Sequence, residues 1–173
     1  QTGLTFTKLE SWGVIAINLI IFYLTYLWAK SEGLMTRFRL DLKDAKAIIW
    51  GFLTIFLMGV IGSNLMLLTH TNYHAELQKT LTTTPILPVT IGMITTAFLQ
   101  EILFRKWIFT WLAPYSKTAV LVSTGLFCLF HMPTNLAYLT LYIGMGLALS
   151  MVYQKRENLS ASITLHVLWN LYT

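Results

Sequence analysis

Long runs of apolar residues alternate with short polar segments along the chain, and this pattern predicts six membrane-spanning helices. The expected spans cover residues 12–29, 47–68, 88–113, 118–131, 135–153 and 159–173. A helix needs roughly 20 apolar residues to cross a bilayer, so the fourth and sixth spans are short for a full crossing. Pro114 and Pro133 follow the third and fourth spans, where a missing N–H ends a helix. The pattern therefore predicts an all-α, polytopic transmembrane bundle.

Composition agrees with a membrane location. The 173 residues are 55% hydrophobic and only 11% charged, whereas soluble domains carry about 25% charged residues. This deficit excludes a disordered chain, a nucleic-acid-binding domain and most soluble enzymes, so the expected partner is the lipid bilayer. One cysteine, Cys128, excludes an internal disulfide and a multi-cysteine metal site. The sequence begins at Gln1 without a methionine, and we expect a single membrane domain that is a fragment of a longer chain.

Basic residues set the expected orientation of this domain. Residues 30–46 hold five of the 12 Lys and Arg residues, and we interpret this segment as a charged cytoplasmic loop with a short surface helix. Only Lys8 and Lys79 fall on the opposite set of connections. Because positive residues collect in cytoplasmic loops, both ends of the sequence are expected outside.

A few polar residues fall at membrane depth, where each is costly unless it is paired. Glu101 and Arg105 are four residues apart, so they share a helix face and can form an ion pair. His166 and Asn170 have the same spacing in the last span, and His131 ends the fourth span. Structural interpretations stay open, because the ion pair could serve only to fix the helix and His131 could contact lipid headgroups.

These residue types suit hydrolysis in two ways. A carboxylate beside imidazoles can orient a water molecule and accept its proton, while imidazole or amide N–H groups stabilise an oxyanion. Alternatively, Glu101, His131 and His166 form a ligand set suitable for catalytic zinc. Both routes predict cleavage of a peptide bond in or at the membrane.

Three short motifs resemble those of the CPBP intramembrane proteases, also called the Abi or CAAX-protease and bacteriocin-processing family. The motifs are Gln100-Glu101-x3-Arg105, Phe127-x3-His131 and His166-x3-Asn170, in this order and on separate spans. Each motif alone is weak, whereas all three in order are specific. The resemblance covers residues 88–173, which we interpret as the catalytic core.

The resemblance implies a helical bundle with a polar cavity between the motif helices. The first residue of the glutamate pair would activate water with the help of His131, and His166 and Asn170 would hold the oxyanion. Arg105 would orient the glutamates, with Phe127 in support. No cofactor is expected, and zinc is the less favoured alternative. The implied protein is a bacterial plasma-membrane endopeptidase, similar to the Ras-converting CAAX endopeptidase, that acts on a peptide or membrane-bound protein.

Gln100 departs from the family pattern, because the first position of the pair is normally Glu. An amide cannot act as a general base, although it can hold a water molecule. Three explanations stay open: Glu was replaced by Gln to trap an inactive enzyme, Glu101 acts in its place, or the chain is a natural pseudoprotease. The last of these predicts an inactive membrane scaffold that binds a peptide or a sensor protein.

Overall fold

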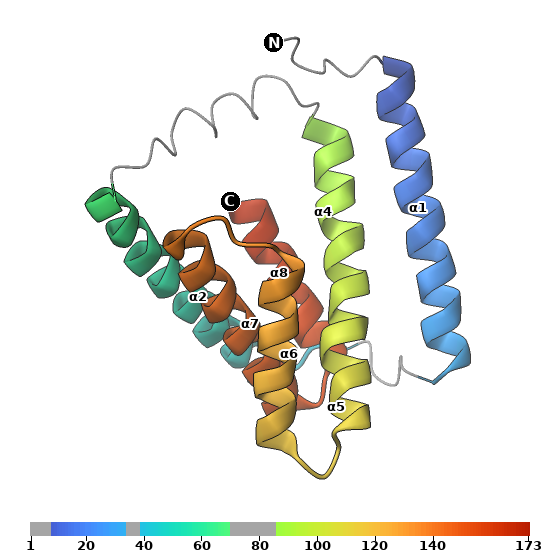
Figure 1. Cartoon of the computed structure of the whole chain (residues 1–173). Helices are drawn as coiled ribbons and strands as arrows, with labels where there is room; N and C mark the ends of the chain where they lie inside the picture. Colours follow the sequence, from blue (N-terminus) through green and yellow to red (C-terminus); the bar gives the residue numbers. More distant parts are fainter. Residues whose placement is uncertain (1–7, 34–38, 70–85) are drawn as a thin grey trace.

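The computed structural model describes residues 8–33, 39–69 and 86–173, and within these ranges the chain is all-α (Figure 1). The helices are α1 (Lys8–Ser31), α2 (Leu42–Thr69), α4 (Ile86–Glu101), the π-helical segment η1 (Ile102–Trp107), α5 (Ile108–Trp111), α6 (Ser116–Phe130), α7 (Leu136–Arg156) and α8 (Leu159–Tyr172). Because α4, η1 and α5 are continuous, the described residues form six helical rods, in agreement with the number of helices predicted from the sequence. Consecutive rods run in alternating directions (Figure 1).

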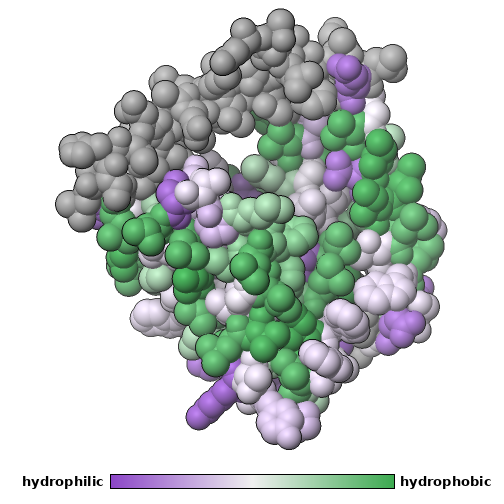
Figure 2. Space-filling model, in the orientation of Figure 1, coloured by the Kyte–Doolittle hydropathy of each residue, from purple (hydrophilic) through white to green (hydrophobic). Residues whose placement is uncertain are grey.

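Four of the described rods are long and apolar enough to cross a membrane. They are Trp12–Ser31, Leu42–Leu65, Ile86–Trp111 and Leu136–Arg156. The other two, α6 and α8, have 15 and 14 residues. Hydrophobic side chains cover much of the visible surface (Figure 2), and such extensive apolar exposure indicates contact with lipid. The chain is therefore an integral membrane protein.

The start of α2 differs from the predicted boundary. This helix begins at Leu42, inside the segment predicted to be a loop. Asp41 and Asp44 each accept a hydrogen bond from the other's backbone N–H, at 2.7 and 3.0 Å, and this reciprocal cap starts the helix. Residues 34–38, where part of the predicted surface helix falls, lie outside the described residues, and residues 39–41 are not helical.

Two other boundaries also move by a few residues. Helix α7 continues to Arg156, which we predicted to lie in a turn, and ends where Glu157 adopts a left-handed φ of 47°. Pro88 lies in the first turn of α4 and not before it, a position that tolerates proline because the first N–H groups of a helix have no partner within it.

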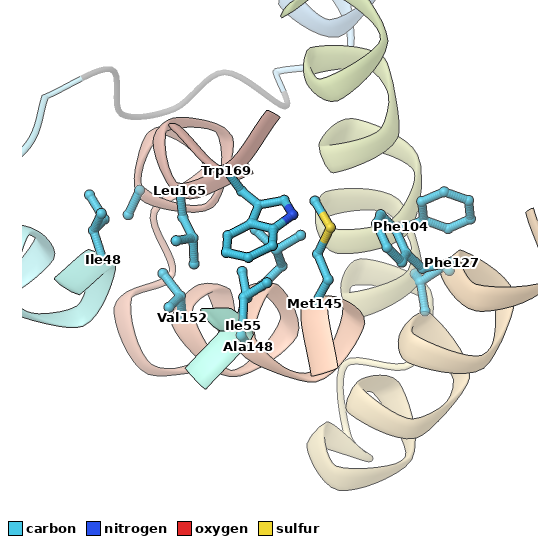
Figure 3. Close-up of a cluster of buried hydrophobic side chains, with 12 residues drawn as sticks. Ile48, Ile55, Phe104, Phe127, Met145, Ala148, Val152, Leu165 and Trp169 are labelled. Atoms are coloured by element: carbon cyan, nitrogen blue, oxygen red, sulfur yellow. The ribbon is translucent and has the colours of Figure 1, made fainter. Parts of the chain in front are cut away.

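Helices α7 and α8 lie in the interior of the bundle. Helix α2 packs along both of them, α6 packs on α7, α4 on α8, and α1 on the outer side of α4 (Figure 1). Where α2 meets α7, Gly144 lies against the side chain of Met58 and Gly62 lies against the backbone of Ala137. A core cluster with members from α2, α7 and α8 fills the space between these helices (Figure 3). This packing brings α4 and α8, which carry two of the motifs, into direct contact.

Candidate active site

The site is built around Glu101, the last residue of α4, whose side chain is fully buried. Its Oε1 lies 2.8 Å from Nδ1 of His166 on α8 and 3.2 Å from Nη1 of Arg105. An ionised carboxylate only accepts hydrogen bonds, so Nδ1 of His166 carries the proton in this contact. The predicted pairing of Glu101 with Arg105 is confirmed, and His166 joins it.

Arg105 lies in the π-helical segment η1, which starts directly after Glu101. Its guanidinium is fully buried; Nη2 donates to the Gly146 carbonyl at 3.3 Å, and the guanidinium carbon lies 4.6 Å from the centre of the Phe127 ring. Widening of the helix at this point is typical of functional sites. A buried cation needs such partners, because an unpaired charge in the interior is strongly destabilising.

The second motif places His131 at the end of α6, one turn beyond Phe127. Nδ1 of His131 lies 2.8 Å from the Phe127 carbonyl oxygen, which can only accept, so Nδ1 carries the proton and Nε2 keeps its lone pair. The imidazole ring lies between the rings of Phe127 and Tyr142, at centroid distances of 4.3 and 4.5 Å. The Phe127 ring also contacts His166 at 5.7 Å, so it joins the two histidines.

Several buried polar atoms of this region have no hydrogen-bonding partner among the described residues. They include Oε1 of Gln100, Oε2 of Glu101 and Oγ1 of Thr124. Buried polar atoms are nearly always bonded to protein, water or a ligand, so such atoms mark places where a polar substrate or water can bind. Gln100 and Glu101 are adjacent, and the free carboxylate oxygen therefore belongs to the motif itself.

Asn170, the last motif residue, also turns toward α4. Its Nδ2 donates to the Met93 carbonyl at 3.3 Å, so His166 and Asn170 share a face as predicted. The structure brings Glu101, Arg105, Phe127 and His166 into mutual contact, and it adds His131 through Phe127. Asn170 contacts α4 at Met93, about two helical turns from Glu101.

The ligand set expected for zinc is not assembled. Glu101 and His166 meet, but no group of three His, Cys, Asp or Glu side chains that could hold a metal occurs in the described part of the chain. His131 is instead fixed through Nδ1 to the Phe127 carbonyl, between two aromatic rings. The zinc alternative, with Glu101, His131 and His166 as ligands, is the less favoured interpretation of the sequence and stays a prediction.

Sequence reasoning missed two neighbours of the site. Gly146 supplies the carbonyl that binds Arg105, and added bulk there would meet Thr124 at 3.0 Å. Its signal was the Gly144-x-Gly146 pair in the fifth predicted span. The ring of Tyr142 contacts His131 in a tilted arrangement, and nothing in the sequence distinguishes Tyr142 from an ordinary aromatic residue of an apolar helix.

Comparisons with known proteins agree with the motifs. A family model described as type II CAAX prenyl endopeptidase, Rce1-like, matches residues 82–172, which include all three motifs. The chain is also 28% identical over 175 residues to the UPF0177 protein YvdC of Lactococcus lactis subsp. lactis (strain IL1403). That similarity covers 96% of this chain and 66% of the relative, so the chain spans just under two thirds of the relative's length. No solved structure matches the chain.

Proposed function

The chain belongs to the Rce1-like family of type II CAAX prenyl endopeptidases, and from this membership we propose that it cleaves a peptide or membrane-associated protein within the bilayer. The observation that carries the proposal is the fully buried hydrogen bond between Glu101 and His166, supported by Arg105. A carboxylate that fixes one imidazole nitrogen and leaves the other for the substrate is a common arrangement in hydrolases.

The two histidines take different roles in this proposal. Nε2 of His131 accepts a proton from the attacking water, which the Gln100 amide holds in place. As the water oxygen bonds to the scissile carbonyl carbon, His166 and Asn170 donate to the developing oxyanion. His166 donates through Nε2 in its doubly protonated form, which the Glu101 carboxylate stabilises. The C–N bond then breaks and His131 returns its proton to the leaving amine.

We further propose that all six rods cross the membrane around a polar cavity. The alternating directions of the rods support six crossings, and the short α6 and α8 would require a locally thin bilayer. The distribution of basic residues supports a cytoplasmic location for residues 30–46 and external ends for the sequence, in a bacterial plasma membrane. Residues 88–173 would form the catalytic core.

A second candidate function is an inactive membrane scaffold that binds a peptide or a sensor protein. The observation that favours it is Gln100, because this buried side chain stands where a general base is expected and cannot act as one. Under this hypothesis the polar atoms of the site bind a partner without cleaving it.

Reconstitution in liposomes separates the two candidates. The parent chain and Gln100→Glu are incubated with fluorogenic peptides, with and without a prenylated C-terminal cysteine. We expect Gln100→Glu to cleave at least about 100-fold faster than the parent, because a carboxylate at this position can accept a proton from the water as well as hold it, which an amide cannot. His131→Ala and His166→Ala in the same background should abolish cleavage. Absence of cleavage by Gln100→Glu across the peptides would favour the scaffold.

A further inference from the structure

Asp44, at the start of α2, forms a second buried polar cluster that the three motifs do not include. Its side chain is fully buried, and both oxygens are occupied. Oδ1 accepts from Nε of Arg156 at 2.7 Å, while Oδ2 accepts from Nδ2 of Asn158 at 2.9 Å and from the Asp41 backbone N–H at 3.0 Å. Asp44 therefore bonds the start of α2 to the connection between α7 and α8.

Asn158 extends this connection into α8, the helix that carries His166. Its Oδ1 accepts from the Ser160 backbone N–H at 3.1 Å, so it caps α8. Its Nδ2 donates both to Asp44 and to the Arg39 carbonyl at 2.9 Å. Because Asn158 is fully buried and bonded at both ends of its amide, the first turn of α8 is held in a fixed position relative to α2.

A second contact lies further along the same two helices. A Cβ atom added at Gly51 of α2 would overlap the Leu165 side chain, and Leu165 directly precedes His166. Asp44 and Gly51 are seven residues apart, as are Asn158 and Leu165. Seven residues are about two helical turns, so the two contacts form one seam between α2 and α8. Leu165 lies beside α2 residues of the core in Figure 3.

We infer that α2 is the positioning element of the site, with Asp44 and Gly51 fixing α8 so that His166 reaches Glu101. Neither residue touches the substrate; Asp44 acts through Asn158, and Gly51 acts by admitting Leu165. A hydrogen bond weakens steeply when its donor and acceptor are displaced. The 2.8 Å contact between His166 and Glu101 therefore requires that α8 neither slides along its axis nor shifts sideways. Both positioning residues lie outside the segment 82–172 that matches the family. The catalytic consequence rests on the proposed function, whereas the geometric one does not.

The test compares glycine substitutions in protein labelled with 15N-histidine and placed in lipid nanodiscs. Gly51→Ala should move the His166 Nδ1 resonance, which His166→Gln identifies, toward its position in Glu101→Gln. Both substitutions add bulk against α7, Gly51→Ala at Cγ2 of Val152 (3.1 Å) and Gly62→Ala at the Ala137 carbonyl oxygen (2.8 Å), but only Gly51→Ala also presses on α8. Gly62→Ala is therefore the matched control. Gly125→Ala, where nothing lies within 4 Å, is the neutral control.

A rescue variant separates positioning from general destabilisation. In Gly51→Ala/Leu165→Val the shortened side chain removes the overlapping atoms, and the His166 signal should return to the parent position. If Gly51→Ala does not fold, Asp44→Asn tests the other contact, because the amide that replaces Oδ2 no longer accepts from Asn158. An unmoved His166 signal in the folded variant, or an equal movement in Gly62→Ala, would overturn the inference.

The rate of peptide cleavage is the second measurement. The glycine substitutions are made in the parent or in Gln100→Glu, whichever of the two is active. Gly51→Ala should lower kcat at least about tenfold with KM within about twofold, since orientation is lost while binding is kept. Gly62→Ala should leave kcat within about twofold of the parent. Equal losses of kcat in both variants would contradict a positioning role. If no variant cleaves any peptide, the proposed function fails, and the resonance measurement still decides the inference.

Discussion

Among the residues that the structure describes, two carboxylates are completely buried, Glu101 in α4 and Asp44 in α2, and their contacts are distributed differently. Both oxygens of Asp44 are occupied, by Arg156 on one side and by Asn158 and a backbone N–H on the other. Glu101 has an ion pair with Arg105 and a hydrogen bond with His166 on the same oxygen, and its other oxygen has no hydrogen-bonding partner among the described residues. A carboxylate whose two oxygens both accept hydrogen bonds can have a purely structural role. A carboxylate with one oxygen that accepts no hydrogen bond can still bind a reacting group.

The two carboxylates also link different helices. Asp44 links α2 to the start of α8, while Glu101 links α4 to the middle of α8. Helix α8 is thus held by one charged cluster at its cap and by another at His166. Variants of the two clusters should therefore separate stability from activity.

The largest expected effect follows from removing the cation beside Glu101. Arg105→Met leaves a buried carboxylate with an imidazole as its remaining partner, which should lower the free energy of unfolding by about 3–5 kcal/mol. SDS titration followed by circular dichroism measures this change. Lys106→Met, at the neighbouring and less buried position, is the control and should change stability by less than about 0.5 kcal/mol. Similar stability of the two variants would mean that Arg105 does not hold the site together.

The next effect is a loss of activity at His166 with little change in stability. His166→Gln removes a proposed oxyanion donor but keeps a polar side chain of similar size. Cleavage by Gln100→Glu should fall about 100-fold or more when this change is added, while the free energy of unfolding shifts by less than about 1 kcal/mol. If His166→Gln lost stability as well as activity to a similar extent, the contact between Glu101 and His166 would be structural, like the contacts of Asp44.

A moderate effect on stability is expected at Asp44. Asp44→Ala leaves the buried amide of Asn158 without one of its acceptors, which should lower the free energy of unfolding by about 1–3 kcal/mol. Asp41→Ala is the matched control, because its side chain is 41% exposed and its loss should cost no more than about 1 kcal/mol. The same titration compares the two variants. An equal cost at both positions would remove the distinction between the buried and exposed aspartates.

The smallest expected effect is at Tyr142, whose ring contacts His131. Tyr142→Phe keeps the ring and should leave kcat within about twofold, whereas Tyr142→Ala should lower it about three- to tenfold by loosening the imidazole. Peptide cleavage in liposomes measures both. A larger effect of Tyr142→Phe than of Tyr142→Ala would show that the hydroxyl, and not the ring, is the functional group.

The helical pattern and the charge spacing predicted much of the fold and part of the site. The long apolar runs predicted the six helices, and Pro114 and Pro133 marked the ends of two of them. A membrane helix can be predicted in this way because its length and composition are local properties of the sequence. The four-residue spacing of Glu101 and Arg105 predicted their ion pair, since both residues lie on one helix. These predictions depend on neighbours in the sequence.

The contacts between helices could not be predicted in this way. Nothing local indicates that Asp44 meets Asn158, 114 residues away in the sequence, and we interpreted the segment of Asp44 as a loop. The same limit applies to the zinc alternative, because spacing along the chain does not say whether its three side chains meet in space. The three side chains have suitable chemistry, but the structure fixes His131 on its own helix and its neighbouring rings.

The π-helical segment has a consequence at the edge of the membrane. A widened turn accommodates one extra residue, which rotates everything beyond it by about 100° relative to an uninterrupted α-helix. Trp107 ends η1 and Trp111 ends α5; they are 59% and 77% exposed and, four residues apart, share a face. Indole rings favour the boundary between lipid tails and headgroups. Deleting one residue from η1 should therefore rotate these two tryptophans by about 100° relative to α4 and Glu101.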